Sequence, residues 1–260
     1  FMHGVVLFSR GPVAIGIAGD SGTGKDTLSS ALAGLFEEGA TASVSGDDYH
    51  RFERGSPMWQ SLTHLHPSAN HLSRFSRDVL TLLDGKAIFC RHYDHTYGRF
   101  IPNQLIVGSE VILVSGLHAF HKKALQGRFD SKIFLDMDER LRRYLKIRRD
   151  VQKRRQPLEK IVASMEARVP DYQRYVKPQR ELANLIFRLE PVRPAQLEPV
   201  LEGPEAPDLQ LRVTTSEDLP LKSLADDFLA IGGVSVTLEL GEEPGHPERR
   251  VLVIPDQHLD

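Results

Sequence analysis

The residues with the most specific chemistry form a glycine-rich run near the start of the chain. The run Gly19-Asp20-Ser21-Gly22-Thr23-Gly24-Lys25 fits the phosphate-binding pattern G-x-x-x-x-G-K. An apolar, β-branched stretch at 13–18 precedes it, and apolar residues at helical spacing follow over 27–36. The glycines let several backbone N–H groups point at one phosphate, and Lys25 can reach the outer phosphates. The run therefore predicts a nucleoside triphosphate site, for which ATP is the expected ligand.

The residue after the lysine departs from this pattern. Ser or Thr is expected there, because its hydroxyl binds Mg²⁺, but this chain has Asp26 followed by Thr27. A carboxylate is also a good oxygen ligand for Mg²⁺. We therefore expect Asp26 to bind the metal, and residues 19–27 together to bind ATP and Mg²⁺.

The next strand is predicted at residues 41–45, and a second polar cluster follows it directly. It contains Asp47, Asp48 and His50. Ligands of parallel sheets bind at the carboxyl ends of the strands. A carboxylate there could accept the proton of a hydroxyl group that attacks a phosphate. The residues alone leave a second possibility open, in which Asp47 or Asp48 only caps a turn.

The stretch 138–155 predicts a long and strongly basic helix. A charged stretch is often only a solvated helix face, but phosphate binding is the alternative that we favour. Asp150 lies inside this cluster and could hold an arginine or a metal. Nine basic residues occur here, namely Arg140, Arg142, Arg143, Lys146, Arg148, Arg149, Lys153, Arg154 and Arg155.

The remaining pattern predicts an α/β fold of the P-loop NTPase type, with a doubly wound parallel sheet and helices on both faces. Residues 46–75 are expected to be mostly loop. Further strands are expected at 110–114, 132–135 and 185–189, and further helices at 77–83 and at 158–168, the latter stopped by Pro170.

Proline crowding divides the chain into three predicted parts. Residues 1–190 are expected to form the P-loop domain, 191–208 a proline-rich linker, and 209–260 a β-rich extension. In the extension, the alternating stretch 234–240 predicts a strand that pairs antiparallel with 250–254. From the start at Phe1 rather than at a methionine, we expect either a piece of a longer chain or the remnant of a tag.

Composition bounds the class of protein. The net charge of −2 provides no basic field for nucleic acid or an anionic membrane, and no apolar run is long enough to span a bilayer. The single cysteine, Cys90, excludes an internal disulfide and fits a cytoplasmic location. The pairs His64/His66 and His92/His95 have no further ligands at zinc-site spacing, so zinc is not expected.

The order of motifs resembles the phosphoribulokinase/uridine kinase family over residues 11–190, and its phosphoribulokinase branch most closely. Besides the glycine-rich run, the matching stretches are Gly46-Asp47-Asp48-Tyr49-His50-Arg51-Phe52-Glu53-Arg54, Leu65-His66-Pro67-Ser68-Ala69-Asn70, Tyr93-Asp94-His95-Thr96, Ser115-Gly116-Leu117-His118, Arg149-Asp150, Pro170-Asp171-Tyr172 and Lys177-Pro178-Gln179.

This resemblance implies a kinase that transfers the γ-phosphoryl group of ATP to a hydroxyl of a small sugar phosphate, with ribulose 5-phosphate as the leading candidate. It implies that Asp47 is the catalytic base, assisted by Lys25 and Asp150. It also implies an acceptor site, whose residues are His50, Arg54, Tyr93, His95, Lys146, Arg149 and Arg154. The alternatives are a nucleoside kinase, a kinase of another sugar, or a nucleotide-binding regulatory domain without catalysis; a homo-oligomer remains open.

The sequence departs from the family at positions that bear on activity. Besides Asp26, Ser115 stands where the family has a glutamate near the metal. We expect the two changes to be linked, with Asp26 replacing the lost acid. Thr23 and Ser45 occupy the positions of the redox cysteines of plant-type members, so no thiol switch is expected.

Overall fold

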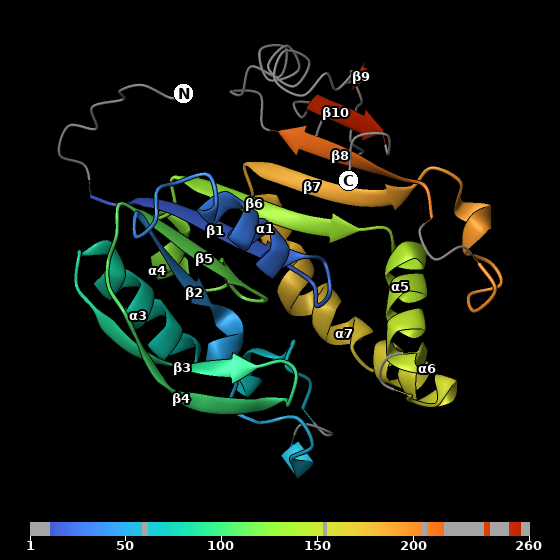
Figure 1. Ribbon diagram of the computed structural model, residues 1–260, viewed down its shortest axis with the longest axis horizontal. Helices are drawn as coiled ribbons and strands as arrows, with labels where there is room; N and C mark the ends of the chain where they lie inside the picture. Colours follow the sequence, from blue (N-terminus) through green and yellow to red (C-terminus); the bar gives the residue numbers. More distant parts are fainter. Residues whose placement is uncertain are drawn as a thin grey trace. The chain divides into compact units, whose positions relative to one another are not determined.

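The computed structural model describes residues 11–58, 62–152, 155–203, 207–215, 237–239 and 250–255 (Figure 1). The chain divides into two compact units. The first unit comprises Phe1–Ala18 and Lys25–Lys132, and the second comprises Gly19–Gly24 and Ile133–Asp260. The predicted strand at 234–240 is described only at 237–239, and the rest of it lies outside the described residues.

Three parallel strands form the centre of the first unit. They are β1 (Val13–Gly19), β2 (Thr41–Ser45) and β5 (Val111–Gly116), with β5 paired to both of the others. Every residue of β5 is buried, which is why its sequence is a nearly continuous apolar run. The three predicted strands are confirmed: β2 has the predicted bounds, and the ends of β1 and β5 differ from the prediction by one or two residues.

The helices of the first unit differ from the expectation mainly at their ends. The helix predicted at 27–36 begins and ends earlier, and the helix predicted at 77–83 begins five residues earlier, inside the supposed loop. Buried Leu72 and Phe75 supply that missing first turn. The helical elements are α1 (Lys25–Ala33), η1 (Gly46–Tyr49), η2 (Pro67–Ala69), α3 (Leu72–Leu83) and α4 (Lys123–Gln126).

An antiparallel hairpin in the first unit was not predicted from the sequence. It consists of β3 (Ile88–Asp94) and β4 (Arg99–Ile106), whose register shifts between Cys90 and His92. This irregularity and the polar residues on both strands interrupt the alternation that would signal a strand.

The second unit continues from parallel to antiparallel pairing. β6 (Ser131–Met137) and β7 (Leu185–Pro191) are parallel, whereas β8 (Leu209–Thr215), β10 (Arg250–Pro255) and β9 (Thr237–Glu239) follow in antiparallel order. The predicted strands at 132–135 and 185–189 and the predicted pairing of the tail are confirmed. β8 was not predicted, and it lies between β7 and β10.

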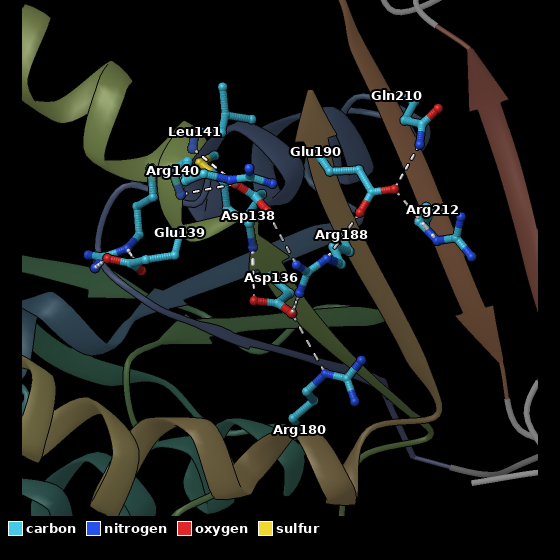
Figure 2. Close-up of polar contacts among 12 residues, drawn as sticks. Asp136, Asp138, Glu139, Arg140, Leu141, Arg180, Arg188, Glu190, Gln210 and Arg212 are labelled. Atoms are coloured by element: carbon cyan, nitrogen blue, oxygen red, sulfur yellow. Dashed lines mark hydrogen bonds and ion pairs between the residues drawn. The ribbon is translucent and has the colours of Figure 1, made fainter. Parts of the chain in front are cut away.

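Charged side chains on neighbouring strands of the second unit form ion pairs with one another (Figure 2). Arg188 on β7 contacts Asp136 on β6 at 2.9 Å and Glu190 at 3.2 Å. Glu190 in turn contacts Arg212 on β8 at 3.7 Å. Burial lowers the pKa of Arg188. The carboxylates of Asp136 and Glu190 raise it by more, so the pKa lies above its usual value. The core sheet and the C-terminal strands are thus linked by charge as well as by backbone hydrogen bonds.

The basic helix α5 (Glu139–Gln152) contributes buried side chains to two apolar clusters of the second unit. Leu141 and Tyr144 pack with Leu197, and Ile147 packs with Ile161 and Met165. The other helical elements are α6 (Leu158–Glu166), α7 (Val169–Asp171), η3 (Tyr172–Val176), η4 (Lys177–Leu182) and η5 (Pro194–Leu197).

The helix predicted at 158–168 is confirmed as α6, but it ends at Glu166, before it reaches Pro170. Pro170 lies in the first turn of α7, where its missing N–H has no helical partner to lose. Within the part of the chain that the structure describes, we find no helix with the length and apolar character needed to cross a bilayer.

Two glycines fix how closely η1 approaches the end of β5. A Cβ on Gly116 would lie 3.0 Å from the Gly46 Cα and 3.3 Å from its nitrogen, both backbone atoms that yield little. We expect Gly116→Ala to lower the free energy of unfolding by about 1–3 kcal/mol, the usual cost of overpacking, measured by urea denaturation. Gly127→Ala is the control, because no described atom lies within 4 Å of its Cβ position. Equal stability of both variants would contradict this reading.

Candidate active site

The glycine-rich run has the backbone form that phosphate binding requires. It connects the end of β1 to the start of α1, and Gly22 and Gly24 have φ angles of 84° and 90°. Residues with a Cβ rarely adopt this left-handed conformation. The loop therefore curls in the way the sequence pattern predicts, directly before Lys25.

Asp20 holds the loop of the second unit in shape. Its carboxylate accepts the N–H of Ser21 at 2.6 Å, and its carbonyl accepts the hydroxyl of Thr23 at 2.9 Å. The other carboxylate oxygen lies 3.2 Å from Nη1 of Arg142 on α5. Asp20 is only 5% exposed, so this ion pair is shielded from water. One side chain thus orders the loop and also fixes an arginine beside it.

A pocket of about 100 Å³ in the second unit joins this loop to the basic helices. Its walls include Asp20, Ser21 and Gly22 of the loop, and its cations are Arg142, Lys146, Arg149 and Arg168. Clustered cations and loop amides are the donors that phosphate oxygens require. The pocket therefore suits an anionic group.

From the sequence, Arg142 was named only as one of nine basic residues of a predicted helix, and Arg168 was not named as a site residue. Arg142 lies one helical turn before Lys146, and that spacing was a usable signal. Arg168 is the last residue of the helix predicted at 158–168, and nothing in the sequence indicated that its side chain would line a pocket. Burial lowers the pKa of Arg168, and the nearby charges of Arg142 and Arg149 lower it further, while Asp20 opposes them. An anion in the pocket would relieve this crowding of positive charge.

Asp150 lies behind two of the expected substrate residues. Its carboxylate accepts hydrogen bonds from Lys146 Nζ at 2.7 Å and from Arg149 Nε at 2.9 Å, and the residue is 2% exposed. Burial raises the pKa of Asp150, but the bonds to Arg149 and Lys146 outweigh it, so the pKa is lowered. Asp150 therefore positions both cations. Arg154, also expected here, lies outside the described residues.

In the first unit, Asp47 stands between two imidazoles. Ser45 caps η1, with its hydroxyl accepting the Asp47 N–H at 3.3 Å. His50 Nε2 lies 3.5 Å from one carboxylate oxygen of Asp47, and His95 Nε2 lies 3.3 Å from the other. Burial raises the pKa of Asp47, but His50, His95 and Lys25 outweigh it and hold the pKa well below its usual range. Asp47 is thus an ionised carboxylate with an electrostatic link to Lys25.

Asp48 has a different environment. It accepts the backbone N–H of Tyr93 at 2.7 Å and lies 3.2 Å from His92 Nδ1. Burial raises the pKa of Asp48. The sequence alone did not show which of the two acids has a chemical role. In the structure, Asp48 binds the β3–β4 hairpin, whereas Asp47 is kept ionised by its neighbours.

The other expected acceptor residues of the first unit lie close to Asp47. The ring of Tyr93 packs against His50 and His95, with ring centres 5.4 and 5.2 Å apart. Burial raises the pKa of Tyr93, and the charge of exposed Arg54 opposes that rise. The hydrogen bond to Asp47 raises the pKa of His95.

The donor set near α1 suits a metal that is shared with phosphates. Asp26 is exposed in the first turn of α1, and its charge also contributes to the raised pKa of His95. Ser115 is buried on β5, in register with Ser45. Among the described residues, no group of three His, Cys, Asp or Glu could hold a metal by itself. Mg²⁺ usually takes one or two carboxylates and completes its shell with water and phosphates, so Asp26 fits that pattern.

Comparisons with known proteins agree with the fold and the motifs. A model of the phosphoribulokinase/uridine kinase family matches residues 14–195. The chain is 32% identical over 205 residues to phosphoribulokinase of Synechocystis sp., covering 79% of this chain and 60% of that protein. It is 31% identical over 181 residues to uridine kinase of Leuconostoc citreum, covering 67% and 86%.

The structural comparison concerns the fold alone. The phosphoribulokinase from Rhodobacter spheroides superposes with a TM-score of 0.69 at 18% identity, covering 96% of this chain and 92% of that chain. The predicted α/β P-loop fold with a C-terminal antiparallel extension is thereby confirmed. The chain spans 60% of the length of the Synechocystis protein and 50% of the chloroplastic phosphoribulokinase of Triticum aestivum.

We expect Asp150→Asn to destabilise the protein by about 1–3 kcal/mol at neutral pH, because hydrogen bonds to a charged group are lost. The lowered pKa of Asp150 means that its contribution is present above the unfolded value of 3.8 and disappears as the pH falls through the lower folded value. Urea unfolding from neutral pH down to about pH 3 should therefore show the variant approaching the wild type. Glu166→Gln, at an exposed site on α6, is the control. A difference that is independent of pH would count against an ionised Asp150.

Proposed function

Because this chain belongs to the phosphoribulokinase/uridine kinase family, we propose that it is an ATP-dependent kinase that phosphorylates a hydroxyl of a small sugar phosphate. The observation that carries the proposal is the state of Asp47. Its carboxylate is ionised, partly exposed, flanked by two imidazoles and linked electrostatically to Lys25. A base near the lysine that binds the outer phosphates is what hydroxyl phosphorylation needs.

In the proposed reaction, residues 19–27 bind ATP, with loop amides on the phosphates and Lys25 on the β and γ groups. Asp47 accepts the proton of the acceptor hydroxyl, whose oxygen bonds to the γ-phosphorus as the bond to the ADP oxygen breaks. His50 and His95 hold the carboxylate in place for this transfer. Asp26 would bind Mg²⁺, which supplies positive charge to the phosphates.

The acceptor is proposed to carry a phosphate of its own. In the first unit, His50 beside Asp47 and Arg54, whose charge acts on His95, support this. In the second unit, Lys146 and Arg149 in the cationic pocket support it as well. A neutral nucleoside would not need so many cations. Ribulose 5-phosphate remains the leading candidate, and Arg154 is included among its proposed ligands. We also propose that residues 1–190 form the catalytic part, that 191–208 connect it, and that 209–260 extend the sheet.

Asp47→Asn should lower kcat by about 10²–10⁴-fold, the usual contribution of a general base, with little change in nucleotide affinity. ATP consumption should be measured with Mg²⁺ against a panel of pentose phosphates, other sugar phosphates and nucleosides. Asp84→Asn, at an exposed helix end, is the matched control. Turnover on a nucleoside but on no sugar phosphate would overturn the acceptor class. Nucleotide binding without turnover on any acceptor would favour the regulatory reading.

Asp26→Ala should abolish Mg²⁺-dependent turnover, because the proposed metal ligand is lost. Ser115→Glu, which restores the acid found in the family, should be tolerated. The readouts are the Mg²⁺ concentration at half-maximal rate and the retention of Mn²⁺ by the protein–ATP complex, followed by electron paramagnetic resonance. Full activity and unchanged metal retention in Asp26→Ala would refute the exchange of acids.

A further inference from the structure

Asn70 contacts the site from a motif to which no role has been given so far. It follows η2, forms an isolated β-bridge with His50, and is 4% exposed. Its side chain makes three hydrogen bonds. The Nδ2 group lies 2.9 Å from the carbonyl of His64 and 3.0 Å from that of His66, while Oδ1 lies 2.7 Å from His50 Nδ1.

These contacts determine which end of the amide is which. Two carbonyl oxygens can only accept, so the atom that faces both must be the amide nitrogen. The atom that faces His50 is therefore the amide oxygen, which can only accept. It follows that His50 carries a proton on Nδ1 whether its ring is neutral or charged.

The other nitrogen of His50 then has two possible states. Nε2 lies 3.5 Å from a carboxylate oxygen of Asp47. When His50 is neutral, Nε2 presents a lone pair to that carboxylate and cannot donate. When His50 is charged, Nε2 becomes a donor toward Asp47 or toward another anion nearby.

The tight packing around His50 hinders rotation of its ring, which would exchange the positions of Nδ1 and Nε2. The residue is 3% exposed, and its ring packs against those of His64 and Tyr93, with centres 5.3 and 5.4 Å apart. The cavity that it lines together with Asn70 and His118 has about 10 Å³ of space, room for about one water molecule.

The charged groups around His50 come from several elements. Arg91 donates to the His50 carbonyl, and Lys25 and His95 act on Asp47. His118 also faces His50, and burial lowers the pKa of His118 to about 3, so it adds no positive charge at neutral pH. Asp47 is thus the anion nearest to the His50 ring among the described contacts.

We propose that Asn70 is a positioning residue that holds His50 as the Nδ1–H tautomer, so that His50 binds a phosphorylated acceptor only as an imidazolium. The second half of this proposal rests on the proposed function, whereas the first half does not. Without Asn70, a neutral His50 could move its proton to Nε2 and still donate. Affinity for the acceptor is therefore made dependent on pH by a side chain that need not touch the acceptor.

Two variants separate positioning from mere structural support. Asn70→Ala and Asn70→Asp both remove the Nδ2 donor to the carbonyls of His64 and His66. Only Asn70→Asp keeps an oxygen that accepts from His50 Nδ1. A purely structural role would make the two variants alike, whereas tautomer control would make them differ. Asn103→Ala, at an exposed position on β4, is the matched control.

The first measurement is the ¹⁵N NMR spectrum of the histidine rings in the protein without substrate, with His50→Gln used to assign the signals. In the wild type, in Asn70→Asp and in the control, neutral His50 should carry its proton on Nδ1. In Asn70→Ala it should shift toward Nε2. An Nε2–H tautomer in the wild type would overturn the proposal even if no variant folds, and it would leave the kinase assignment untouched.

The second measurement is the KM for the phosphorylated acceptor from about pH 5 to about pH 8, the range in which histidines change charge. For the wild type, KM should be about tenfold or more higher where His50 is neutral than where it is charged, the loss expected for a charge-assisted hydrogen bond. For Asn70→Asp the same rise should occur at higher pH, because the added carboxylate beside Nδ1 favours the charged ring. For Asn70→Ala, KM should be nearly flat. A flat wild-type profile, or equal profiles in both variants, would overturn the link to acceptor binding. Absence of turnover alongside a confirmed tautomer would instead count against the proposed function.

Discussion

The negative charge of Asp47 is maintained at a place where burial alone would remove it. Desolvation favours the neutral acid, and the protein reverses this preference with two imidazoles and the ammonium group of Lys25. Each of these groups comes from a different part of the first unit. His50 follows η1, His95 follows β3, and Lys25 begins α1. The local fold of the first unit can therefore be understood as the means of bringing three cationic or ionisable groups to one carboxylate.

The close approach of two glycines serves the same arrangement. Gly46 begins η1 and Gly116 ends β5, and their backbones meet at a distance that leaves no room for a Cβ. η1 carries Asp47 in its first turn and Asp48 directly after it. Two adjacent acids thereby obtain opposite surroundings, because one is held by imidazoles and the other is taken up by the hairpin. A difference of one residue in a tight turn is enough to separate their chemistry.

The sequence revealed the parts of this architecture that depend on local pattern. Buried parallel strands gave continuous apolar runs, and the glycine-rich run between 19 and 25 stood out by spacing alone. The β3–β4 hairpin was missed because its residues are polar and its register is irregular. Arg168 and Asn70 were missed as site residues for another reason. Their importance comes from contacts with residues distant along the chain or from the direction of a single amide, and neither leaves a periodic trace.

The charged ladder across β6, β7 and β8 has a consequence for the edges of the sheet. Arg188 and Glu190 alternate with apolar neighbours along β7, and their partners lie on the strands to either side. A strand that ends a sheet invites pairing with other molecules unless charged side chains make that pairing unfavourable. If β8 were to separate from β7, Arg188 would keep its contacts with Asp136 and Glu190, and Glu190 would lose its contact with Arg212. The edge left on β7 would then carry a charged pair, Arg188 and Glu190, which makes pairing with another strand less favourable.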